Sequence, residues 1–174
     1  GTEDGVARVG ISVCDITAGM TAYAAILQSL FARSRTGKGR IIEVSLFHAI
    51  ADWMNVPYMQ ARYGNKPPPR VGVRHPTISP YGAFTCKDGK AVLLSIQNER
   101  EWQALCSDVL GDATLATDER YGSNVLRVKN NTELERTIGA CLEKFTREDA
   151  ITRLSDAGIA CGRLSDMQDL MQHP

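Results

Sequence analysis

The stretch from residue 9 to residue 46 constrains the fold of this chain more than any other part. The short apolar segment 9–14 is followed by apolar residues at helical spacing over 16–35, and the glycine-containing turn 36–39 ends that run. Segment 41–46 then has the alternation that is typical of a strand. The order strand, helix, glycine turn, strand predicts a βαβ unit, and such units build parallel sheets.

Asp15 stands where the first expected strand gives way to the helix. Aspartate is a preferred N-cap residue, and the free N–H groups of a helix start favour its ionised form. Gly19, with the small Ala18 and Ala22, would also let a ligand or another backbone approach closely. An exposed, pre-oriented carboxylate in that setting can serve as a nucleophile, so the pattern leaves both capping and catalysis open.

Segment 64–70 contains three consecutive prolines, which disfavour a helix or a central strand. It predicts an extended linker with a domain boundary near Pro69. The predicted fold class is therefore α/β, with a parallel-sheet portion of a large domain in residues 1–69 and a small α+β domain in residues 70–174.

Local signals predict the elements on both sides of this linker. Asp88-Gly89 indicates a hairpin between 81–86 and 91–96. A strand is expected near Cys161. The predicted helices are 46–63, 98–110, 133–144 capped by Asn131, 147–157 capped by Thr146, and 166–172.

Charge and cysteine usage exclude several classes of partner. Twenty basic and twenty acidic residues cancel without long runs of one sign, which argues against nucleic acid or an anionic membrane surface. The five cysteines form no C-x-x-C pair and are typical of buried thiols in a reducing compartment. The three histidines share no metal-ligand spacing with them, so we expect no metal. The first long apolar run is interrupted by polar residues and is too short to span a membrane, which favours a cytoplasmic protein.

Several other conspicuous side chains are expected to be structural. Tyr23, Trp53 and Trp102 fall at helical positions beside aliphatic residues, which predicts core packing. His48 is expected to be a buried histidine and Cys14 a packed thiol.

The string VCDITAGMTAYAAILQSLFARSRTGKGRIIEVSLFHAIADW closely resembles the class III (CaiB/BaiF-type) coenzyme A transferase family. Its members carry a catalytic Asp before a helix of this kind, followed by an R-x-R-T-G-K-G helix end and a strand. The segments YGAFTCKDGKAVLLSIQNEREWQALC and LSDAGIACGRLSDMQDLMQHP also look like the family's small domain, so the resemblance covers essentially the whole chain. Family chains are much longer, with a Rossmann-like N-terminal half that supplies most of the coenzyme A pocket. An internal fragment is therefore expected.

The resemblance implies an acyl-CoA:carboxylate CoA-transferase with Asp15 as nucleophile and an aspartyl anhydride and an aspartyl-CoA thioester as intermediates. Acyl-CoA and a small carboxylic acid are the implied substrates, and no permanently bound cofactor is expected. The helix-start amides of Ile16, Thr17, Ala18 and Gly19 are the candidates for binding the oxyanions. Members of the family form interlocked dimers, so a homodimer is also expected.

The family places a loop of the small domain over the active site, and the aligned segment here is 71–82. Some transferases have a run of glycines there, whereas this chain has two separated glycines and polar side chains. The departure suggests that Arg74, His75 and Pro76 contact the substrate, with Arg74 or His75 addressing a carboxylate. An ordinary linker turn is the alternative.

Two other functions stay open at this point. An α-methylacyl-CoA racemase of the same family would use the same Asp with an upstream His as a proton-transfer pair. The chain can also be a non-catalytic fragment that only associates with its other half or with a second chain.

Overall fold

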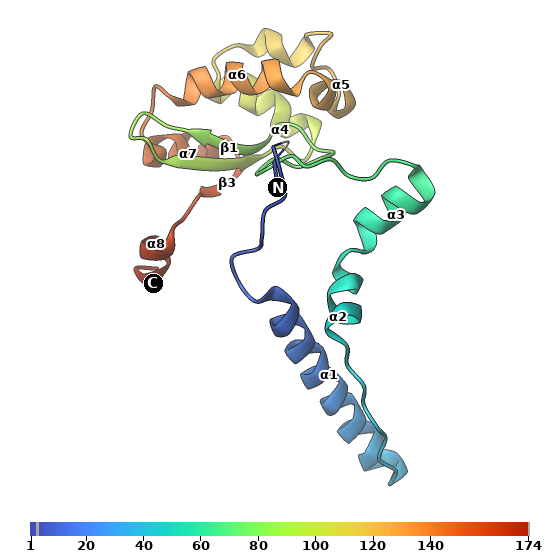
Figure 1. Ribbon diagram of the computed structural model, residues 1–174. Helices are drawn as coiled ribbons and strands as arrows, with labels where there is room; N and C mark the ends of the chain where they lie inside the picture. Colours follow the sequence, from blue (N-terminus) through green and yellow to red (C-terminus); the bar gives the residue numbers. More distant parts are fainter. Residues whose placement is uncertain (3, 174) are drawn as a thin grey trace. The chain divides into compact units, whose positions relative to one another are not determined.

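The computed structural model describes residues 1, 2 and 4–173, which form two compact units, Gly1–Arg70 and a second that begins at Val71 (Figure 1). The first unit contains α1 (Val13–Thr36), α2 (Leu46–Trp53) and α3 (Asn55–Gly64). α1 packs against α2. It ends at Gly37, whose φ of 69° is the left-handed conformation that the Thr36-Gly37 turn predicts.

The parallel sheet predicted for this unit is not observed. Segments 9–12 and 40–45, which cover most of the two expected strands, carry no regular structure. A strand exists only where its backbone groups pair with a neighbour, and neither segment has such a partner in the described part of the chain. Hydrophobic alternation indicates that a segment can form a strand. The strand itself forms only when a second strand lies beside it and pairs with its backbone groups.

The single helix predicted over 46–63 is broken at Met54. Pro57 causes the break, because its ring clashes with the carbonyl four residues earlier, on Trp53. α3 then starts at Asn55, so the missing N–H of Pro57 falls in the first turn, where it has no helical acceptor.

The second unit is built on an antiparallel sheet with the strand order β1-β2-β3. Its strands are β1 (Tyr81–Thr85), β2 (Ala91–Ser95) and β3 (Ala160–Arg163). The predicted hairpin is confirmed: Phe84 lies opposite Val92, and Gly89 in the turn has a φ of 74°. This part of the chain is therefore α+β.

The helices of the second unit mostly follow the capping signals. They are α4 (Glu99–Ala104), the π-helical turn η1 (Leu105–Val109), the short 3-10 helix η2 (Ala113–Thr117), α5 (Asn124–Lys129), α6 (Asn131–Leu142), α7 (Arg147–Asp156) and α8 (Met167–Met171). Thr146 caps α7 as predicted, by accepting from the Asp149 N–H. Asn131 does not cap α6 but is its first residue, and α5 was not predicted.

One hydrophobic core holds the second unit together. Phe84, Val92 and Leu94 of the hairpin pack with buried leucines of α6 and α7, with Ile138 of α6 and with Trp102 of α4. Figure 1 shows α6 and α7 beside the strands. Burial raises the pKa of the Cys106 thiol in this core to about 12, so it is not a nucleophile at neutral pH.

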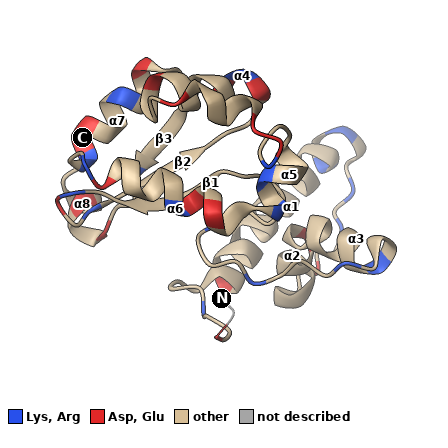
Figure 2. Ribbon diagram, turned by 90° about the horizontal axis from the view of Figure 1, so that it is seen from above, with Lys and Arg blue, Asp and Glu red and all other residues tan. Residues whose placement is uncertain are grey.

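The first unit has almost no buried residues of its own, since Thr17 and Ala49 are the ones described as buried. The predicted burial of Tyr23, Trp53, His48 and Cys14 is therefore wrong for this chain, because all four are exposed. The long middle of α1 carries no charged residue, and its ribbon is largely tan in Figure 2. Several large apolar side chains of this helix are exposed, among them Ile16, Met20, Leu27 and Phe31.

Candidate functional site

Asp15 lies in the first turn of α1, as its third residue, and its side chain is exposed. Ser12 occupies the N-cap position, and no side chain caps the helix. The Asp15 carboxylate makes no hydrogen bond or ion pair within the described residues. The capping interpretation is therefore wrong, and the carboxylate is left available for chemistry.

The helix start also decides which amides can meet an oxyanion. α1 begins at Val13, three residues earlier than predicted, so the Ile16 N–H already donates to the Ser12 carbonyl at 3.0 Å. The amides of Thr17, Ala18 and Gly19 lie further inside the helix and are used in the same way. The expectation that these four amides bind an oxyanion is corrected for this reason.

The Cys14 and Asp15 amides replace them as candidates. The Val13 N–H donates to the Ile11 carbonyl at 2.9 Å, whereas those of Cys14 and Asp15 have no acceptor among the described residues. These two donors belong to the positive end of the helix dipole, where negative charge is stabilised.

The second group of candidate residues lies on the His75 loop, defined here as residues 71–80. Asn124 of α5 fixes this loop by accepting from the Ser79 N–H at 3.0 Å and donating to the Thr77 carbonyl at 2.8 Å. Asn131 of α6 accepts from the Ser79 hydroxyl at 2.6 Å. The loop is therefore held by two helices rather than left as a flexible cover.

Arg127 of α5 is the deepest of these supports. Its guanidinium is almost fully buried and donates to both carboxylate oxygens of Glu99, at 2.9 and 2.8 Å. It also donates to the backbone carbonyls of Ser79 and Tyr121 and lies 5.0 Å from the Trp102 ring centroid. These hydrogen bonds lower the pKa of Glu99.

Arg74 and Pro76 offer less to a substrate than predicted. The Arg74 guanidinium forms an ion pair with Glu135 of α6, 3.0 Å between Nε and Oε2, so its charge is already matched. Pro76 has no N–H and is partly buried.

His75 differs from Arg74 because its imidazole has a hydrogen-bond partner at Nδ1 and none at Nε2 in the described residues. Its ring stacks on Tyr81, with centroids 5.2 Å apart and planes 20° apart. Nδ1 accepts from the Thr77 N–H at 3.2 Å. The ring is therefore oriented before any ligand arrives.

Sequence reasoning missed the residues that support the loop: Asn124, Asn131, Arg127 and Glu99. The available signal was Arg127 itself, a cation between aliphatic residues in the short string NVLRVK. A buried arginine needs a counterion, but the sequence does not say that Glu99, twenty-eight positions away, supplies it.

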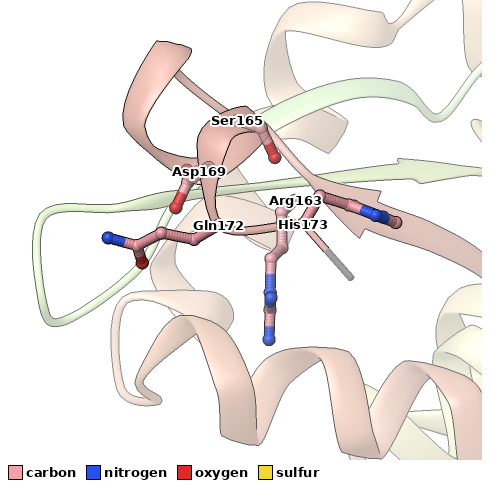
Figure 3. A pocket seen from close by; sticks show the side chains of 5 residues that line it. All are labelled: Arg163, Ser165, Asp169, Gln172 and His173. Atoms are coloured by element: carbon pink, nitrogen blue, oxygen red, sulfur yellow. The ribbon is translucent and has the colours of Figure 1, made fainter.

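A cavity of about 460 Å³ beside α8 is lined by Arg163, Ser165, Asp169, Gln172 and His173 (Figure 3). Its charged groups serve other contacts: Arg163 pairs with Glu148, and Asp169 accepts from the N-cap amide of α8. We therefore do not assign chemistry to this cavity.

The described ranges also bear on metal and membrane binding. No group of three or more His, Cys, Asp or Glu side chains is arranged to hold a metal within them. No helix among these residues combines the length and apolar character of a membrane span.

Comparison with known proteins places this geometry in a family. The family described as CoA-transferase family III matches residues 1–174, and the chain belongs to it. Acetyl-CoA:oxalate CoA-transferase of Acetobacter aceti is 33% identical over 95% of this chain and 42% of its own length. Succinyl-CoA:glutarate CoA-transferase of Mus musculus is 31% identical over 98% of this chain and 39% of its own. The chain thus spans about two fifths of the length of these curated relatives.

Solved structures show the same fold. A CaiB/BaiF family protein from Brucella suis has 29% identity and a TM-score of 0.80 over 100% of this chain and 46% of its own. The Rv3272 protein of Mycobacterium tuberculosis, at 20% identity, has a TM-score of 0.84 over 100% of this chain and 44% of its own.

Proposed function

We propose that the whole protein is an acyl-CoA:carboxylate CoA-transferase with Asp15 as its covalent nucleophile. The observation that carries the proposal is the exposed, unpaired Asp15 carboxylate in the first turn of α1, in a chain of this transferase family. The relatives named above transfer coenzyme A to or from oxalate and glutarate, which supports acyl-CoA and a small carboxylic acid as the substrates.

In the proposed reaction the Asp15 carboxylate attacks the thioester carbonyl of the donor. The C–S bond breaks, giving an acyl-aspartyl anhydride and the coenzyme A thiolate. The thiolate then attacks the aspartyl carbonyl, which forms an aspartyl-CoA thioester and releases the donor carboxylate. The acceptor carboxylate runs the same two steps in reverse and regenerates Asp15.

Each step passes through a tetrahedral oxyanion, and we assign its hydrogen-bond donors to the Cys14 and Asp15 amides. Both intermediates hydrolyse in water, so the site has to exclude solvent. No group of the chain changes its redox state, and coenzyme A enters and leaves as part of a substrate.

The proposal also covers the domain organisation, the oligomeric state and the compartment of the whole protein. Residues 1–69 would belong to a large domain in which segments 9–12 and 41–45 pair in a parallel sheet, and residues 70–174 would form the small domain. An interlocked homodimer in the cytoplasm fits the exposed apolar surface of the first unit and the five free thiols. The racemase gains no support, because the two relatives above are named as transferases.

The test uses the whole protein, incubated with acyl-CoA and hydroxylamine. Hydroxylamine captures an aspartyl anhydride or thioester, so mass spectrometry should find a hydroxamate on the peptide that contains Asp15. Asp15→Ala should abolish this adduct and reduce transfer by at least about a thousandfold, since binding alone cannot replace a covalent route. Asp156→Ala, which removes an exposed aspartate at the end of α7, is the matched control and should behave as wild type.

Folding is not at risk in Asp15→Ala, because the exposed carboxylate makes no hydrogen bond or ion pair in the described residues and its interaction with the helix dipole is worth at most about 1 kcal/mol. If the alanine variant still exchanges labelled carboxylate into acyl-CoA and wild type gives no adduct, the nucleophile assignment is wrong.

A further inference from the structure

His75 is a partly buried histidine whose ring is held in one orientation, while only one of its two ring nitrogens has a hydrogen-bond partner in the described residues. The Thr77 N–H points at Nδ1 from 3.2 Å, and the Thr77 hydroxyl oxygen lies 3.4 Å from the same nitrogen. The stack on Tyr81 fixes the plane of the ring. Nε2 makes no hydrogen bond within the described residues.

These contacts select one tautomer. A backbone N–H can only donate, so Nδ1 must present its lone pair to Thr77. In a neutral imidazole the proton then sits on Nε2, because one ring nitrogen donates and the other accepts. His75 therefore presents an oriented N–H donor at the one ring nitrogen that has no partner in the described part of the chain.

Two arginines of the loop and of its support already have carboxylate partners. Arg74 is paired with Glu135, and Arg127 with Glu99. A neutral N–H donor still forms a charge-assisted hydrogen bond to a carboxylate, stronger than one to the carbonyl of a thioester. It holds the acid less firmly than a free cation would, which suits a reversible transfer in which acids must both bind and leave.

We propose that His75 is a specificity-determining residue of the transfer reaction, which donates Nε2–H to a carboxylate oxygen of the acceptor acid. Thr77 and Tyr81 are positioning residues that act through the imidazole. This inference rests on the proposed function for its reaction, but the carboxylate contact is testable without any turnover.

The kinetic test compares two substitutions in the whole protein. The side-chain amide of His75→Gln reaches the position of Nε2, whereas that of His75→Asn reaches only the position of Nδ1. His75→Gln should therefore keep the KM for the acceptor within about threefold of wild type, and His75→Asn should raise it about tenfold, the usual effect of losing one hydrogen bond to a charged group. The kcat and the KM for acyl-CoA should stay unchanged in both, and His173→Asn serves as the matched control.

A loss of structure at the loop would not separate Gln from Asn in this way. Equal KM values for the acceptor in both variants would overturn the proposal, and so would a rise in the KM for acyl-CoA in place of the KM for the acid.

The binding test follows the His75 ring nitrogens by NMR in protein labelled with ¹⁵N-histidine, while succinate is added. Free protein should show the Nε2–H tautomer, and its Nε2–H resonance should move on titration in wild type. A His75 ring protonated at Nδ1, or an Nε2–H resonance that ignores succinate, would refute the carboxylate contact. If this resonance moves but no coenzyme A is transferred, the proposed function fails while the carboxylate site stands. If coenzyme A is transferred but the resonance does not move, the carboxylate site fails while the proposed function stands.

Discussion

The two units of this chain differ in where their apolar side chains lie. In the second unit the hairpin and its helices enclose Val92, Leu94, Leu134 and Ile138 with almost no exposure. In the first unit the large apolar side chains of α1, α2 and α3 are mostly exposed. They include Ile16, Met20, Tyr23, Ile26, Leu27, Leu30, Phe31, Phe47, Trp53 and Tyr58.

The difference shows that helix formation and core formation are separate requirements. α1 has small residues, a glycine stop and long apolar side chains, which together suffice for a helix. Contiguous exposed apolar patches are uncommon on monomeric proteins in water, so we expect another surface to cover these side chains. That surface can come from another part of the polypeptide or from a second copy.

The largest expected effect contrasts the same substitution in the two units. Leu134 is fully buried, so Leu134→Ala should lower the free energy of unfolding of the second unit by about 2–5 kcal/mol. Leu27 is 48% exposed, so Leu27→Ala should cost less than about 1 kcal/mol in the chain of residues 1–174. Urea denaturation followed by circular dichroism measures both. A similar loss at both positions would show that the first unit has a core after all.

The next effect concerns the buried cation that supports the His75 loop. Glu99→Gln leaves the buried Arg127 without its counterion, and we expect a loss of about 2–3 kcal/mol, below the full cost for a buried pair because Glu99 itself is half-exposed. Glu133→Gln, which breaks an ion pair with the exposed Arg120, should cost at most about 1 kcal/mol. Thermal unfolding of the two variants separates them, and equal losses would mean that the burial of Arg127 is unimportant.

The smallest effect is a pH dependence of the same pair. Arg127 lowers the pKa of Glu99 in the folded state below its usual 4.5, so the folded state favours the carboxylate. The stabilisation is therefore complete above the unfolded pKa and is lost as pH falls through the folded pKa, from about pH 5 downward. The difference in unfolding free energy between wild type and Glu99→Gln should shrink between about pH 5 and pH 3. A difference that is constant over this range would contradict the ion pair.

Local signals in the sequence predicted much of the second unit. Asp88-Gly89 set the hairpin, Thr146 and Gly111 marked helix ends, and Trp102 was placed in the core correctly. Each of these depends on a few adjacent residues or on one side chain's hydrophobicity. The strands predicted at 9–14 and 41–46 are not observed in this chain, because a strand depends on partners elsewhere, and the helix predicted through Met54 is wrong there because the proline break was overlooked.

For the candidate site, the sequence by itself pointed to Asp15 and to the segment with His75, since a carboxylate at a helix start and polar residues in a loop are visible in one dimension. Only the tertiary structure decided which groups stay available. In the structure Ser12 is the N-cap residue of α1, so the amides without a helical acceptor are those of Cys14 and Asp15. The structure also pairs Arg74 with Glu135. The reason is physical: a charge or an amide is available only when no neighbour satisfies it, and those neighbours come from positions that the chain brings together by folding.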